Sequence, residues 1–154
     1  MLKGGDVMVY NAVDVAKYIV TYCNQKNKPV SNLKLQKLMY YAWIDFYKET
    51  GTALFVDDIC AWQLGPVVPE VYYEFCTYAG RPITQEYTVN ITSGDATILN
   101  SIIEKYLNFS ASALVSRTHV QGGAWDRVFR GGVGMRSVIP FSLIKDLECD
   151  SSVC

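Results

Sequence analysis

The amino-acid sequence predicts a mainly α, compact single-domain bundle of about six helices around one central helix, with minor short β structure. Its 154 residues suit one domain with one apolar core. Half of them are hydrophobic and 13% are aromatic, which is enough to fill such a core with rings. Apolar residues recur at helical spacing in most segments, and no repeat, low-complexity run or linker divides the chain, so we expect one domain over residues 1–154.

The first helix should begin after Asn11, whose side chain can cap it, with Asp14 placed three residues on to complete a capping box. Residues 26–29 should end it. One buried face follows the i, i+4, i+7, i+8, i+11 pattern and consists of Ala12, Ala16, Ile19, Val20 and Cys23.

The second helix should be the central one. Ser31 or Asn32 can cap it, and it should run to about Thr50, where Gly51 closes it. It carries two neighbouring apolar stripes, one of Leu35, Leu38, Met39, Ala42 and Phe46, the other of Gln36, Tyr40, Trp43 and Tyr47. A helix with so wide an apolar surface packs on two sides. The solvent-exposed strip that remains consists of Lys34, Lys37, Tyr41, Asp45 and Lys48.

The rest of the chain alternates turns and shorter elements. Residues 53–62 should be extended, with a short strand over about 58–62, and Gly65-Pro66 signals a turn. Pro69 suits the first turn of a helix that Gly80 stops. Its predicted buried face is Val68, Val71, Tyr72, Phe75, Cys76 and Ala79. Residues 85–92 should form a short strand or an extended loop, followed by helices over about 95–108, 111–118 (capped by Ser110) and 140–148, with a glycine-rich loop over 130–136.

Charge and cysteine content exclude several functional classes. The formal net charge of −1 disfavours general nucleic-acid binding, and the nearest approach to a basic patch, Arg117, Arg127, Arg130 and Arg136, is typical of scattered surface charges. Five cysteines (Cys23, Cys60, Cys76, Cys149 and Cys154) without a Cys-x-x-Cys pair, beside a single histidine, predict free thiols in a reducing cytoplasm and no metal site. No stretch is apolar for long enough to predict a membrane span.

The sequence contains few residues that could form a catalytic site. Its one histidine, His119, follows a predicted helix end, where an imidazole that satisfies backbone carbonyls is the more economical interpretation. The alternative is a small hydrolase that pairs His119 with Ser116 or a distant cysteine, but no nucleophile signature accompanies it. The adjacent Asp57 and Asp58 are typical of solvated loop charges. We therefore expect no enzyme, no cofactor and no metal.

Two motifs in order make the sequence recognisable. The stretch Leu33–Ala42 (LKLQKLMYYA), followed by Ala61-Trp62, Gly65–Pro69 and Val71-Tyr72, resembles the Panacea domain, formerly described as a phage-associated or SocA-like domain of unknown function. Thr118-His119, Trp125 and Ile139-Pro140 match the downstream part of that family, so the resemblance covers about residues 11–147. The matching positions are Leu35, Gln36, Lys37, Tyr40, Trp62, Gly65, Pro66, Val67, Pro69, Tyr72, His119 and Trp125.

The resemblance implies a bacterial or prophage antitoxin that neutralises a toxin by direct complex formation, with the toxin encoded next door. It also implies an alternative, since at least one relative is an adaptor that delivers a toxin to a protease. We expect the motif residues to serve mostly the fold, because buried apolar residues usually serve packing. Partner contact should use exposed aromatic and arginine side chains, for which the candidates are Tyr41, Tyr73, Arg81, Arg117 and Arg130. The oligomeric state is left open.

Overall fold

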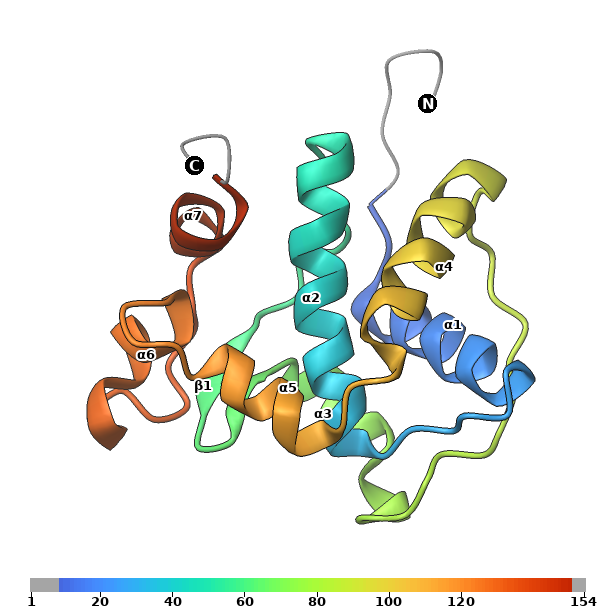
Figure 1. Ribbon diagram of the computed structural model, residues 1–154, viewed down its shortest axis with the longest axis horizontal. Helices are drawn as coiled ribbons and strands as arrows, with labels where there is room; N and C mark the ends of the chain where they lie inside the picture. Colours follow the sequence, from blue (N-terminus) through green and yellow to red (C-terminus); the bar gives the residue numbers. More distant parts are fainter. Residues whose placement is uncertain (1–8, 151–154) are drawn as a thin grey trace.

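A single helix, α2 (Asn32–Thr50), stands at the centre of the protein (Figure 1). The computed structural model describes residues 9–150. In Figure 1, α1 (Ala12–Gln25) and α4 (Ser93–Leu107) lie on one side of α2, and α6 (Ala124–Phe129) and α7 (Phe141–Ile144) lie on the other. α5 (Ala111–Thr118) packs against α2 as well, as does η3 (Lys145–Cys149), a π-helical turn after α7. The predicted mainly α fold around a central helix is confirmed.

The predicted helix caps are present. The Asn11 side chain accepts a hydrogen bond from the Asp14 N–H at 3.1 Å, and Ser31 accepts one from the Lys34 N–H at 3.2 Å. Ser110 does the same for α5. Gly51 ends α2 with a left-handed φ of 73°, a conformation that glycine adopts without the steric cost of a Cβ. Local side-chain chemistry therefore fixes where these helices begin and end.

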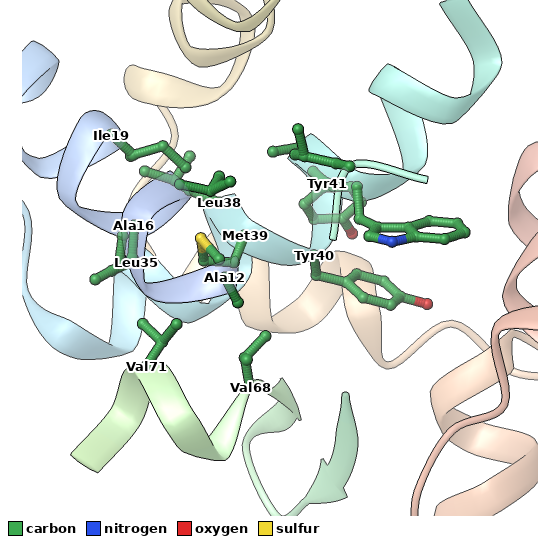
Figure 2. Close-up of a cluster of buried hydrophobic side chains, with 14 of the residues drawn as sticks. Ala12, Ala16, Ile19, Leu35, Leu38, Met39, Tyr40, Tyr41, Val68 and Val71 are labelled. Atoms are coloured by element: carbon green, nitrogen blue, oxygen red, sulfur yellow. The ribbon is translucent and has the colours of Figure 1, made fainter. Parts of the chain in front are cut away.

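Almost the whole circumference of α2 is buried. Figure 2 shows side chains of α1 and of the start of α3 (Pro69–Glu74) gathered around Leu35, Leu38 and Met39, while the Tyr40 ring extends away from α1. The predicted solvent-exposed strip is wrong at two positions, because Lys37 is fully buried and Tyr41 is 9% exposed. Contacts of α2 with α5 and with the strand at residues 65–67 account for this difference.

A small antiparallel hairpin joins α2 to α3. Strand β1 (Cys60–Trp62) pairs with β2 (Gly65–Val67) in the register Cys60–Val67, Ala61–Pro66 and Trp62–Gly65. The chain of residues 136–139 lies along the other edge of β1: the Ala61 N–H donates to the Ser137 carbonyl at 2.8 Å. Strand structure was predicted here, and β1 is shorter than the predicted range of 58–62. The predicted turn at Gly65-Pro66 is wrong by two residues, because both belong to β2 and the turn falls at residues 63–64.

After the hairpin, one prediction is wrong and one helix was not predicted. The helix that begins at Pro69 leaves α-helical geometry at Phe75, where φ is −110°, and a 3₁₀ turn, η1 (Cys76–Tyr78), follows. The helical spacing that placed Cys76 and Ala79 on the buried face no longer applies beyond that point, and both are exposed. Helix α6 was not predicted, since its six residues are too few to show a period; residues 130–132 form a further 3₁₀ turn, η2 (Arg130–Gly132).

The remaining connection, residues 85–92, is an extended loop without strand pairing, which was one of its two predicted forms. The cysteines of residues 9–150 (Cys23, Cys60, Cys76 and Cys149) are free thiols, and Cys154 lies outside the described residues. Nowhere in this range do three histidine, cysteine or acidic side chains come together as metal ligands would. Likewise, none of the described helices combines the length and apolarity needed to cross a bilayer.

Two leucine-to-alanine changes test the position of α2 in the core. Leu35 is fully buried and Leu64, in the hairpin turn, is 53% exposed. Leu35→Ala should lower the free energy of unfolding by about 2–5 kcal/mol, because it leaves a cavity. Leu64→Ala should change it by less than about 0.5 kcal/mol. Urea denaturation of the two variants measures both values, and equal losses would contradict the assigned burial.

Candidate functional site

Side chains of α2 hold the backbone that follows the hairpin. The Gln36 side chain accepts a hydrogen bond from the Val68 N–H at 2.9 Å and donates one to the Asn32 side chain at 2.9 Å. Asn32 in turn donates to the Tyr72 carbonyl at 3.1 Å. Since Gln36 and Asn32 are buried, these bonds satisfy polar groups that could not reach water. Gln36 therefore ties β2 and α3 to the central helix.

Lys37 is a buried lysine whose one hydrogen-bond acceptor is a backbone carbonyl. Its Nζ donates to the Pro66 carbonyl at 3.0 Å, and it forms no ion pair within residues 9–150. Burial disfavours the ammonium form and lowers the pKa of Lys37 to about 7. The amine is therefore neutral in a substantial fraction of molecules at neutral pH.

Gly65 lets β2 approach Lys37 and the end of α5 closely. Its φ of +112° is a conformation that favours glycine. A Cβ at this position would lie 2.6 Å from the Thr118 Oγ1 and 3.1 Å from the Lys37 Cε. The Thr118 hydroxyl is fixed in turn, because it donates to the Val115 carbonyl at 2.7 Å. A side chain at position 65 would have to displace this packing.

His119 and Trp125 stack face to face, and Trp125 also bonds to the hairpin. Their ring centroids are 3.9 Å apart with an interplanar angle of 2°, and the Trp125 Nε1 donates to the Trp62 carbonyl at 2.8 Å. The His119 Nε2 is buried without a hydrogen-bond partner, so the expectation that this ring satisfies backbone carbonyls is wrong for that nitrogen. Burial, and secondarily the nearby Lys37, lowers the pKa of His119.

The Tyr40 ring lies on the side of α2 away from α1 (Figure 2). Its hydroxyl is buried and makes no hydrogen bond of good geometry, and burial together with the nearby Glu148 carboxylate raises its pKa. Glu148 also accepts a hydrogen bond from the Ala124 N–H at 2.8 Å, at the start of α6. This hydrogen bond joins the C-terminal turn to α6, and the same turn also packs against α2.

The hairpin also lines a groove of about 500 Å³. Its walls come from the start of α2, the hairpin, the end of the α3–η1 segment and the loop that follows η2. We call it the hairpin groove, and its lining residues are Ser31, Asn32, Leu33, Gln36, Trp62, Gln63, Leu64, Val67, Tyr72, Ala79, Gly80, Met135 and Arg136. The Arg136 guanidinium lies over the Trp62 ring, 4.2 Å from its centroid. Aromatic, aliphatic and guanidinium groups together form a surface suited to holding another protein.

Of the five predicted partner-binding residues, Arg117 and the nearly buried Tyr41 contact each other, and the other three lie on other elements. Tyr73 is 59% exposed and contacts Trp62 and Tyr72 edge-on, and Arg81 directly follows the groove residue Gly80. Elsewhere, Arg117 lies over the rings of Tyr41, Tyr106 and Phe109. Arg130 ends α6 with a left-handed φ of 47°.

Sequence reasoning missed Leu64, Met135 and Arg136 as groove residues. An exposed leucine in a two-residue hairpin turn was a signal that could have been noticed. Met135 and Arg136 carried no such signal, because they reach the groove only through the pairing of residues 136–139 with β1.

The fold and the hairpin groove define a small helical domain with an open aromatic surface, a class typical of protein–protein recognition. The sequence model described as "Antitoxin SocA-like, Panacea domain" matches residues 35–126. The chain is also 34% identical over 161 residues to the protein named Antitoxin SocA of Caulobacter vibrioides (strain NA1000 / CB15N), covering 92% of this chain and 84% of that protein. This protein belongs to the SocA-like, Panacea-domain antitoxin family. No solved structure matches it.

The buried amine of Lys37 should make stability depend on pH. The pKa of Lys37 is about 7 in the folded chain and near 10.5 when exposed, so between these values the unfolded chain binds more protons. The free energy of unfolding should therefore rise with pH from about 7 upward, with a contribution of up to about 1.4 kcal/mol per pH unit. Lys37→Met should remove this contribution, as urea denaturation between pH 6.5 and 8.5 would measure. Parallel curves for the two proteins would contradict it.

Two glycine-to-alanine changes separate backbone strain from steric exclusion. Gly51 and Gly65 both have positive φ, but a Cβ at Gly51 would meet no atom within 4 Å. Gly51→Ala should cost about 1 kcal/mol of stability from the backbone alone. Gly65→Ala should cost more than about 2 kcal/mol, because it adds the clash with Thr118. Thermal denaturation followed by circular dichroism measures both; equal costs would show that the close approach at Gly65 is unimportant.

Proposed function

We propose that this protein is an antitoxin that neutralises a cognate toxin by binding it directly. The observation that carries the proposal is its 34% identity, across 92% of its length, to a protein named Antitoxin SocA. We further propose that the toxin is encoded by the adjacent reading frame of a bacterial or prophage genome, and that the complex forms in the cytoplasm. Neither a cofactor nor a nucleic acid has a part in this mechanism.

The hairpin groove supports a binding role. Interfaces between proteins are enriched in tyrosine, tryptophan, methionine and arginine at their centres, and four such residues line this groove: Trp62, Tyr72, Met135 and Arg136. The exposed Tyr73 extends the same surface. Their apolar atoms would lose water contact when a toxin binds, and that burial would supply much of the binding free energy.

The geometry gives the hydrolase alternative no support. The ring of His119 is stacked against Trp125, and its Nε2 is buried without a hydroxyl or thiol partner. A general base must reach the proton that it removes, directly or through one water. The adaptor alternative keeps the same binding step and adds a protease, which no described surface identifies.

Co-expression with the adjacent reading frame tests the proposed function. Expression of that frame alone should stop growth, and expression of both should restore it, with the two proteins co-purifying. A neighbour that is harmless alone, or that does not co-purify, would refute the proposal as stated. The adaptor alternative predicts two further results. This protein should speed degradation of the toxin, and growth rescue should be lost or slowed in a strain that lacks the degrading protease.

A change at position 119 separates binding from catalysis. Phenylalanine preserves an aromatic ring beside Trp125 while it removes both titratable nitrogens, so His119→Phe should keep growth rescue close to that of the natural protein. Circular dichroism controls for folding. If the variant is folded, binds the toxin and yet loses rescue, the side chain has a chemical role and the hydrolase alternative gains its first support.

A further inference from the structure

We propose that the hairpin groove holds a segment of the toxin in which an apolar side chain is flanked by a carboxylate, and that the carboxylate pairs with Arg136. This inference rests on the proposed function and adds to it the place of contact and the chemistry of the partner segment. It draws on three properties of the groove: its apolar lining, its one-sided charge and its constrained backbone.

The groove presents apolar side chains that the fold leaves uncovered. Leu64 is 53% exposed and Met135 is 47% exposed, and they line the groove together with the half-buried rings of Trp62 and Tyr72. A cavity of about 500 Å³ lies in the size range that holds a few side chains or a small ligand. The lining therefore calls for an aliphatic or aromatic group on the partner.

The charge of the groove is of one sign. Arg136 is the single charged residue among those that line it, and Arg81 follows Gly80 at its edge. Neither arginine pairs with a carboxylate within residues 9–150; the Arg81 guanidinium donates to backbone carbonyls, and that of Arg136 lies over Trp62. A guanidinium stacked on an aromatic face still has its N–H edge free to bind a carboxylate in two-point geometry. A partner segment with an acidic residue would complement this charge.

The backbone of the groove is strained at two lining residues. Four non-glycine residues within residues 9–150 have positive φ, and Ala79 and Arg136 are two of them, at 53° and 69°. Such conformations cost free energy and are found preferentially at binding sites. The backbone of Arg136 is also fixed in place, because its N–H donates to the Ala61 carbonyl at 2.6 Å. The arginine is thus held beside Trp62 before any partner arrives, which lowers the entropy lost on binding.

Charge substitutions at Arg136 provide the test. The probe is the purified protein encoded by the adjacent reading frame, and the readout is the dissociation constant measured by calorimetry. Arg136→Gln should weaken binding by about tenfold, and Arg136→Glu by more. Leu64→Ala should also weaken it, with stability unchanged. Lys48→Glu is the matched control: it makes the same charge change at an exposed residue near the other end of α2, roughly 25 Å along the helix, and should leave binding within about twofold.

Charge reversal on the toxin then identifies the partner group. Acidic surface residues of the toxin are changed to lysine one at a time, and at least one change should restore binding to the Arg136→Glu protein. If the natural protein does not bind the neighbour at all, both the proposed function and this inference fail. If it binds and rescues growth while the Arg136 and Leu64 variants bind as tightly, only the groove inference is overturned. Loss of self-association in these variants, with toxin binding intact, would show that a second copy occupies the groove and would also overturn it.

Discussion

The structure depends on one set of hydrogen bonds, in which side chains of the central helix reach the backbone of the segment that follows it. Trp43 donates to the Phe55 carbonyl, Lys37 donates to the Pro66 carbonyl, and Gln36 accepts from the Val68 N–H. A two-stranded hairpin satisfies few of its own backbone groups and is marginally stable in isolation. Here the helix supplies a partner for the Pro66 carbonyl and holds the chain before and after the hairpin, so the hairpin is fixed against the core.

The hairpin connects the core to the groove because its residues contact both. Gly65 lies close to Lys37 and Thr118, and the Trp62 carbonyl accepts the hydrogen bond from Trp125. The Trp62 ring lines the groove, where it contacts Tyr72 and lies under the Arg136 guanidinium. The backbone of Trp62 is therefore held by the core, while its side chain lines the groove. Motif residues of the hairpin belong to the fold and to the proposed binding surface at once.

Much of this fold could be predicted from the sequence, because caps and helical periodicity are local. Asn11, Ser31, Ser110 and Gly51 mark helix ends through chemistry that involves only their near neighbours. The burial of Lys37 could not be predicted in this way, since lysine is rarely buried and its acceptor lies 29 residues away. The groove was equally hidden, because four segments distant in the chain form its walls and no periodicity links them. The groove gains its charged residue, Arg136, only because residues 136–139 pair with the edge of β1.

The buried position of Lys37 also limits how this sequence can change over evolutionary time. On a protein surface, lysine and arginine replace each other freely because both are cations there. At position 37 the amine can lose its proton, whereas a guanidinium cannot, and it would need more acceptors than the Pro66 carbonyl. We therefore expect Lys37→Arg, a mild exchange on a surface, to be more destabilising at this position than Lys37→Met, although methionine differs more from lysine in its chemistry.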